Sequence, residues 1–230
     1  MRQRENLAVA RAMLMYRCMR LYYSPGACSL APHIALREAE RSFELVRVDL
    51  HTNRLATGED YQLVTPKGEV PALMLDGPGS DLLTENVAVL LYIADLVPEK
   101  RLAPPPGTFA RYHMIEMLAY LATSVHAEFS PLFHPETPAP VAERHRGKIG
   151  EAFLYLQHDL EDKGFLMGET FTVADCYFFP MLRWCERFGM DLQTWPNLDI
   201  YYHRVVERPS VQAALGAEGL LVQHRMRRTA

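Results

Sequence analysis

The chain has 230 residues, of which 49% are hydrophobic and 23% are charged, as is usual for a globular protein large enough to build sizeable cores. Its formal net charge of -4 at pH 7 gives no indication of nucleic-acid binding. No apolar run approaches the roughly 18 residues of a membrane span, so no membrane partner is expected either.

The cysteines and histidines do not form a recognisable metal-binding pattern. The four cysteines form no C-x-x-C pair, and the nine histidines form no H-E-x-x-H motif. Cys176 and Cys185 fall in one helical pattern but point to roughly opposite faces of it. We therefore expect no metal and no structural disulfide, which favours a reducing compartment such as the cytoplasm.

Residues 1–18 differ from the rest of the chain because they carry four arginines against one acidic residue. This composition resembles a targeting segment, but the segment has neither a long apolar core nor an A-x-A cleavage site. We expect a disordered extension, or an upstream start codon with Met19 as the true start. A functional extension is the alternative.

From Met19 the sequence alternates between strand and helix patterns. The predicted elements, in chain order, are a strand at 19–23, a helix from Ser29 to about Ala39, a strand at 43–50, a polar segment at 51–62, a strand at 70–75, a turn at 76–79, a short strand at Leu82 and Leu83, and a helix over 85–97 capped by Thr84. A helix between the first two strands favours parallel pairing, whereas the tight turn favours a hairpin. Residues 19–101 are thus predicted to form an α/β domain with a mixed four-stranded sheet.

Three consecutive prolines and a glycine make residues 102–108 a predicted stiff linker between two domains. Residues 109–220 then show helical periodicity and predict an all-helical bundle domain. Its expected helices contain Ile115 to Phe129 and span about 141–162, 172–189, 197–206 and 209–215. Thr172 and Asp175 have the spacing of a helix-capping box. Residues 221–230 form a basic tail.

Cys28 is the first candidate for chemistry, because it lies between the turn at Pro25 and Gly26 and the helix that opens at Ser29. The N–H groups at a helix start favour an anion and should lower the pKa of a thiol there. Ala31, three residues on, leaves no resolving cysteine in the helix, which argues against a dithiol mechanism. The alternative is that Cys28 is a small buried apolar residue.

Three further positions carry both a functional and a purely structural interpretation. A cis bond at Val70–Pro71 would turn the backbone of Val70 outward to pair with an extended peptide, but an ordinary trans proline at a strand start is the alternative. Glu85 at a helix start suits a substrate ammonium or simply the helix dipole. His126 lies at the edge of an apolar helical stripe, where it faces either a cleft or the core.

These candidate residues lie, one after another along the chain, within longer sequence segments. The segments are LYYSPGACSLAPHIALREAE, PKGEVPAL, LLTENVAVLLYIAD, ARYHMIEMLAYLATSVHAEFSPLF and FTVADCYFFPMLRW. Together they resemble the bacterial beta-class glutathione S-transferases from Met19 to about Leu220. The resemblance implies an N-terminal thioredoxin-like domain, a C-terminal all-helical domain and a homodimer.

The resemblance also implies a role for each candidate residue. Val70–Pro71 would be a cis-proline corner whose Val70 backbone pairs with the cysteinyl backbone of glutathione. Glu85 and Asn86 would hold the γ-glutamyl end. The remaining implied site residues are Cys28 and His126 near the glutathione sulfur and Thr123 on the wall of the same site. The Thr172–Asp175 box would be a structural cap.

The resemblance implies glutathione as co-substrate and no metal. The expected function is conjugation of glutathione to a small hydrophobic electrophile, with Cys28 able to form a mixed disulfide with glutathione. A glutathione-dependent thiol-disulfide reductase or peroxidase is one alternative. A non-enzymatic dimer that binds hydrophobic ligands or glutathione is the other, and Met114, Met117, Tyr120, Phe129 and Phe133 would line its cleft.

Three departures from the family pattern predict weak glutathione binding. Asn53 and Ala127 stand where relatives often carry lysine, and Ala119 stands where they often carry asparagine. Each lost charge-assisted hydrogen bond weakens binding by about 1.5–3 kcal/mol, or less where solvent replaces it. A calorimetric titration with glutathione should therefore give a weaker affinity than in relatives that keep these residues, and an equal affinity would contradict the prediction.

Overall fold

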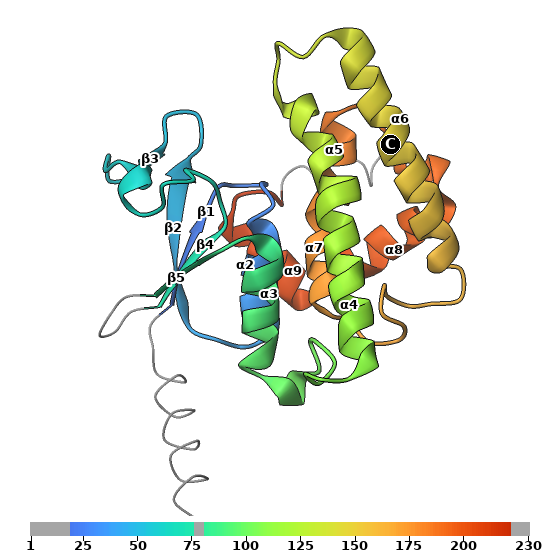
Figure 1. Ribbon diagram of the computed structural model, residues 1–230, viewed down its shortest axis with the longest axis horizontal. Helices are drawn as coiled ribbons and strands as arrows, with labels where there is room; N and C mark the ends of the chain where they lie inside the picture. Colours follow the sequence, from blue (N-terminus) through green and yellow to red (C-terminus); the bar gives the residue numbers. More distant parts are fainter. Residues whose placement is uncertain (1–18, 76–80, 222–230) are drawn as a thin grey trace, which may run out of the picture.

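The computed structural model describes residues 19–75 and 81–221, in which a β-sheet lies beside a group of helices (Figure 1). The features predicted at 1–18, 76–79 and 222–230 lie outside the described residues. The strands are β1 (Met19–Tyr23), β2 (Phe43–Asp49), β3 (Arg54–Leu55), β4 (Ala72–Leu75) and β5 (Asp81–Thr84). A thioredoxin-like mixed sheet followed by helices confirms the predicted fold class, whereas the boundaries of the domains stay a prediction.

The sheet has five strands in the described residues, in the order β3-β2-β1-β4-β5, so the prediction of four strands was wrong. β1 pairs parallel with β2, while the β1–β4, β4–β5 and β2–β3 pairs are antiparallel. The additional strand, β3, has two residues and lies at the edge, opposite Val48 and Asp49. A strand of this length is too short to show the alternation by which sequence patterns reveal strands.

The remaining elements are helices. They are α2 (Leu30–Glu38), α3 (Asn86–Asp95), α4 (Phe109–Tyr120), α5 (Ala127–Phe129), α6 (Ala139–Asp159), α7 (Val173–Arg187), α8 (Pro196–Val206) and α9 (Pro209–Ala217), with short helices η1 (Tyr61–Leu63), η2 (Pro98–Lys100), η3 (Leu121–His126), η4 (Ser130–Phe133) and η5 (Leu192–Thr194). The predicted helix around Ile115–Phe129 is interrupted, because η3 is a π-helix between α4 and α5. None of the described helices is long and apolar enough to cross a membrane.

Helices α2 and α3 lie between the sheet and the C-terminal helices (Figure 1). α2 contacts α3, α7 and α9, and its Leu30 and Ile34 side chains are fully buried. The same core cluster includes Leu21 of β1 and Phe178 of α7. One apolar core therefore joins the sheet to the C-terminal helices, so the helix that follows Cys28 is fixed from both sides.

The predicted capping box at the start of α7 is confirmed. The carboxylate of Asp175 is fully buried and accepts hydrogen bonds from the backbone N–H groups of Leu166 at 2.9 Å and Thr172 at 2.8 Å. It also accepts from the hydroxyls of Thr172 and Tyr201, at 3.0 and 2.9 Å. Asp175 thus ties the start of α7 to α8 and to the loop that precedes α7.

The substitution Asp175→Ala should destabilise the fold severely, because it leaves four buried donors without an acceptor. We expect the free energy of unfolding to fall by about 3–5 kcal/mol, measured by urea denaturation. The control is Asp191→Ala, which removes an exposed carboxylate that caps η5 through Gln193 at 3.0 Å. That change should cost about 1 kcal/mol or less, and equal losses in the two variants would contradict the assigned role of Asp175.

Candidate functional site

Six of the seven predicted site residues line one small cavity of about 80 Å³. The residues around it are Cys28, Lys67, Glu69, Val70, Pro71, Thr84, Glu85, Asn86, His126 and Tyr177. Thr123 is not among them: its exposed side chain lies one turn before His126 and donates its hydroxyl to the Ala119 carbonyl at 3.0 Å. The predicted role of Thr123 in binding therefore stays a prediction, without a contact to the cavity.

The Cys28 thiol donates a hydrogen bond to the Val70 carbonyl oxygen over 3.2 Å. Burial raises the pKa of this thiol to about 12, although hydrogen bonds from Asn86 and from backbone N–H groups act in the opposite direction. The expectation of a lowered pKa at the helix start was therefore wrong, because desolvation outweighs the favourable dipole of α2. At neutral pH Cys28 is a hydrogen-bond donor rather than a thiolate.

The Val70–Pro71 peptide bond is cis, and the ordinary trans alternative does not apply. Val70 is 8% exposed and lies two residues before Ala72, the first residue of β4. The preceding residue is also fixed, because the Tyr61 hydroxyl donates to the Glu69 carbonyl at 2.9 Å. The backbone around Val70 is thus held in place at the cavity wall, opposite the Cys28 thiol.

Glu85 has an unusual backbone for a residue that is not glycine, with φ 70° and ψ 122° just before α3. Its carboxylate pairs with Lys67 rather than with the free N–H groups of α3, so the helix dipole alone does not explain it. Lys67 also donates to the Thr84 hydroxyl at 3.2 Å. Thr84 ends β5 and does not cap the helix as predicted. Positive φ at such a residue commonly marks a functional site.

Asn86 provides a buried acceptor at the same wall. The residue is 6% exposed, and its Oδ1 atom has no hydrogen-bond partner in the described part of the chain. A buried amide oxygen without a partner is costly, so it is suited to a donor group that a ligand brings. The acceptor Asn86 and the carboxylate of Glu85 together fit an ammonium group.

His126 reaches the cavity at the end of the π-helix η3. Its Nδ1 shares a hydrogen bond of 2.9 Å with the Tyr177 hydroxyl of α7, and its ring lies 5.2 Å from the ring of Trp184. Burial lowers the pKa of His126 to about 4, so its imidazole is neutral at pH 7. Of the two alternatives for His126, cleft or core, the structure places its ring at the cavity, where it offers hydrogen bonds and no positive charge, and its role in binding stays a prediction.

Sequence patterns did not reveal Lys67, Glu69 or Tyr177 as cavity residues. Lys67 and Glu69 lie within the PKGEVPAL segment, directly before the Val70–Pro71 bond, so their proximity to that corner was the available signal. Tyr177 lies in the apolar run of α7, where an aromatic residue indicates packing. Of the suggested cleft residues, Met114 and Phe129 are fully buried in the core and do not line a cleft.

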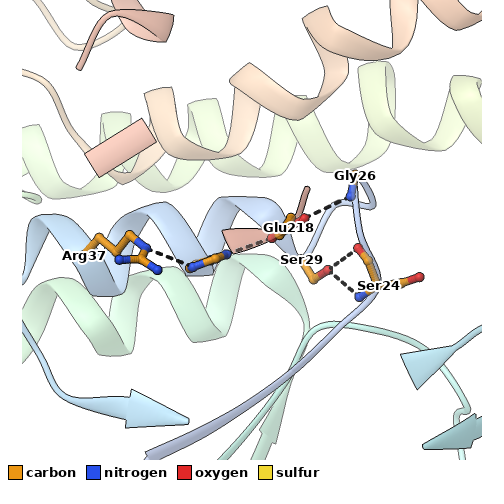
Figure 2. Close-up of polar contacts among 6 residues, drawn as sticks. Ser24, Gly26, Ser29, Arg37 and Glu218 are labelled. Carbon is orange, nitrogen blue, oxygen red and sulfur yellow. Dashed lines mark hydrogen bonds and ion pairs between the residues drawn. The ribbon is translucent and has the colours of Figure 1, made fainter. Parts of the chain in front are cut away.

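Side chains from the C-terminal helices hold the loop that carries Cys28. Gly26, at φ 73°, donates its N–H to Glu218 at 2.9 Å and accepts a hydrogen bond from the Trp184 indole at 2.8 Å. The other oxygen of Glu218 lies 2.8 Å from His33 Nδ1, and His33 Nε2 accepts from Arg37 at 2.9 Å. Figure 2 shows the contacts that run from Gly26 through Glu218 to Arg37. Because Nε2 is an acceptor, the His33 proton is on Nδ1.

A second set of contacts closes the same loop from within. The Ser29 hydroxyl accepts from the Ser24 N–H at 3.1 Å and donates to the Ser24 carbonyl at 3.3 Å (Figure 2). These bonds span the turn that contains Gly26. The position of the Cys28 sulfur is therefore set by β1, α2, α7 and Glu218 together.

The three departures from the family pattern lie outside the cavity lining. Ala119 and Ala127 are exposed, on α4 and α5. Asn53 adopts φ 53°, a left-handed conformation that asparagine tolerates well, and its side chain packs against Gly68. Asn53 thus has a conformational reason to be in its loop, and its effect on binding stays a prediction.

The substitution Glu218→Ala should destabilise the protein through the Gly26 loop. It leaves the Gly26 N–H and the buried His33 Nδ1–H without an acceptor, and we expect a loss of about 2–4 kcal/mol in the free energy of unfolding. The control Glu143→Ala removes a carboxylate that is 79% exposed and that makes a longer contact, of 3.4 Å, with Arg146. Its effect should stay below about 0.5 kcal/mol. A Glu218→Ala variant as stable as this control would contradict the assigned clamp.

His126 should make stability depend on pH. The folded chain holds the pKa of His126 at about 4, below the ordinary histidine value of 6.5, so the unfolded chain binds more protons between these values. The neutral His126 ring thus contributes fully to the free energy of unfolding above pH 6.5. This contribution falls by at most about 3 kcal/mol as the pH falls to 4. In urea denaturation, the free energy of unfolding of the wild type should rise from pH 4 to pH 7, and His126→Gln should make this rise smaller. His113→Gln, at an exposed position, should leave it unchanged, and an unchanged slope in His126→Gln would contradict the assignment.

Comparison with known proteins agrees with this architecture in both halves of the chain. Residues 18–95 match the family model of the glutathione S-transferase N-terminal domain, and residues 109–209 match that of the C-terminal domain. The chain is 46% identical over 202 residues to the glutathione S-transferase GstA of Escherichia coli O157:H7, covering 88% of this chain and 100% of that protein.

Two solved structures extend the comparison. One is the bacterial beta-class glutathione S-transferase of Sphingomonas chungbukensis, with 47% identity, a TM-score of 0.84, and coverage of 87% of this chain and 99% of that one. The other is a sphingomonad glutathione S-transferase complexed with glutathione, with 43% identity, a TM-score of 0.84 and the same coverage. The chain belongs to the glutathione S-transferase family, and within it to the bacterial beta class.

Proposed function

We propose that the protein is a glutathione transferase that conjugates glutathione to small hydrophobic electrophiles. The observation that carries this proposal is the cavity in which a thiol donor, a neutral imidazole and an acid–amide pair lie together. Family membership supports it, as does the sphingomonad relative complexed with glutathione. We extend the proposal to a homodimer in the cytoplasm, on the basis of the family alone.

The charged and polar groups of the cavity suggest an orientation for the tripeptide. The Glu85 carboxylate and the unpartnered Asn86 Oδ1 suit the γ-glutamyl ammonium. The Val70 backbone suits the cysteinyl peptide group, and Lys67 offers a positive charge for a carboxylate. This orientation leaves the glutathione sulfur between Cys28 and His126, as the family resemblance implies.

Conjugation then needs the glutathione thiolate to be stabilised. The Cys28 thiol remains protonated at neutral pH and can turn its S–H from the Val70 carbonyl toward the sulfur. His126 can add a second hydrogen bond without a charge. The thiol proton of glutathione passes to solvent, the sulfur forms a bond to the electrophile, and any leaving group departs with its bonding electron pair.

The hydrophobic electrophile would lie beside His126 on an aromatic cluster. Trp184 contacts the His126 ring, and the Phe133 ring lies 5.2 Å from Trp184 and 4.8 Å from Phe188. Phe133 and Phe188 are only partly buried, so they keep apolar surface for a ligand. Such a surface favours aromatic or otherwise planar electrophiles.

Thiol-disulfide exchange is the second candidate function, because Cys28 is the described cysteine that lines the cavity. Exchange requires the Cys28 thiolate, and the raised pKa makes that form scarce in the empty site. We therefore propose conjugation as the main activity and a mixed disulfide between Cys28 and glutathione as a slower reaction.

The variant Cys28→Ala separates these two reactions. After incubation with oxidised glutathione, intact-mass measurement should find one glutathione per wild-type chain and none on the variant. Conjugation should persist, with kcat/KM lowered about tenfold or less, because only one hydrogen-bond donor is lost. Cys28→Ser keeps a donor and should retain more conjugation than Cys28→Ala, again without an adduct.

Three outcomes would contradict this account. An adduct that persists in Cys28→Ala would show that another cysteine reacts. Complete loss of conjugation in Cys28→Ala, with the fold intact, would make Cys28 essential to that reaction. Wild-type protein without either activity at saturating glutathione would favour the non-enzymatic binding protein.

A further inference from the structure

The His126 ring is held by two aromatic residues of α7, Tyr177 and Trp184. These lie seven residues apart, about two helical turns, so they project from the same face of that helix. The Tyr177 ring stands at 86° to the His126 ring with 5.8 Å between the ring centres, and the Trp184 ring lies 5.2 Å away at 45°. Packing against α7 therefore fixes the orientation of the His126 ring.

The two nitrogens of the His126 ring have different surroundings. Nδ1 lies 2.9 Å from the Tyr177 hydroxyl oxygen. Nε2 makes no hydrogen bond with any residue that the structure describes, and His126 lines the cavity together with Cys28. Nε2 is thus the ring nitrogen that is available to a ligand in the cavity.

The direction of the hydrogen bond between Tyr177 and His126 follows from the donors available. A neutral imidazole has one N–H donor and one bare nitrogen that accepts. Burial raises the pKa of Tyr177, with smaller contributions from Cys28 and Glu85, so the phenol keeps its hydrogen. Tyr177 is 2% exposed, and within the described residues its hydroxyl has His126 as its hydrogen-bond partner. If Nδ1 donated, this buried phenol hydrogen would lack an acceptor, which costs stability. The hydroxyl therefore donates to Nδ1, and the ring hydrogen is on Nε2.

We propose that Tyr177 is a positioning residue for conjugation: its hydroxyl keeps the His126 hydrogen on Nε2, where it faces the glutathione sulfur. An Nε2–H group donates to the glutathione thiolate and stabilises its charge. The other tautomer would present a lone pair to the same sulfur and repel the thiolate. Tyr177 acts through His126 and does not itself touch glutathione. The kinetic part of this inference rests on the proposed function, whereas the position of the hydrogen does not depend on it.

Nitrogen-15 NMR of the full chain at pH 7 tests the position of the hydrogen. The couplings of the two ring nitrogens to the carbon-bound ring hydrogens distinguish the tautomers, and the His126 signals are those lost in His126→Gln. We expect wild-type His126 to carry its hydrogen on Nε2. In Tyr177→Phe, which removes only the hydroxyl, both tautomers should be populated and the two nitrogen shifts should approach each other. The wild-type spectrum decides the tautomer even where Tyr177→Phe folds poorly.

The kinetics of conjugation test the consequence. Tyr177→Phe should lower kcat about fivefold, because the thiolate loses an oriented donor, and should change KM for glutathione less than about twofold. In the His126→Gln background the same substitution should change kcat less than about twofold, because Tyr177 acts through His126. The matched control is Tyr201→Phe, which removes another buried hydroxyl, one that donates to Asp175 at 2.9 Å. This control should leave the His126 signals and kcat unchanged.

Three results would overturn the proposal. They are a wild-type hydrogen on Nδ1, an unchanged tautomer in folded Tyr177→Phe, and an equal loss of kcat from Tyr177→Phe in the wild-type and His126→Gln backgrounds. The last result would mean that the Tyr177 hydroxyl contacts glutathione itself. Wild-type protein with its His126 hydrogen on Nε2 but without conjugation would instead refute the proposed function, and with it the kinetic part of this inference.

Discussion

The hydrogen bonds at Gly26 are the contacts on which the site depends most. Gly26 lies two residues before Cys28. Its backbone N–H binds Glu218 and its carbonyl binds Trp184, both from the C-terminal half of the chain. A buried carboxylate is stable there because Gly26 and His33 both donate to it. The reactive loop of the N-terminal part therefore takes its position from the C-terminal helices, and neither half builds the site alone.

The interior of the site is electrically neutral. Burial keeps the Cys28 thiol protonated and the His126 imidazole uncharged at pH 7, since it disfavours the charged form of each. The charges of Lys67 and Glu85 lie further out, where their side chains are 49% and 66% exposed. A bound tripeptide would meet charge at its ends and hydrogen-bond donors at its sulfur, which is the distribution that conjugation requires.

Much of the fold could be predicted from residues 19–221 because the signals were local. The turn at Gly26, the Thr172–Asp175 spacing and the periodicity of the helices each report on neighbouring residues. The two-residue strand β3 and the π-helix before His126 were missed, because each depends on contacts rather than on a repeating pattern. The positive φ of Glu85 could not be predicted from the sequence either, because a glutamate side chain does not require that conformation.

The candidate site was predictable as a set of residues but not in its electrostatics. Family resemblance selected Val70, Glu85 and His126 over their structural alternatives, and they line one cavity with Cys28. The helix start suggested a more acidic Cys28 thiol, but the amount of burial, which decides its pKa, comes from residues distant in sequence. Glu218 and Tyr177 were missed for the same reason.

The central claim is that the glutathione sulfur binds between Cys28 and His126. A crystal structure of the protein with glutathione tests it most directly. The account predicts the sulfur within hydrogen-bond distance of both side chains, and the γ-glutamyl ammonium beside Glu85 and Asn86. Glutathione bound with its sulfur away from Cys28 and His126, or bound outside this cavity, would contradict it.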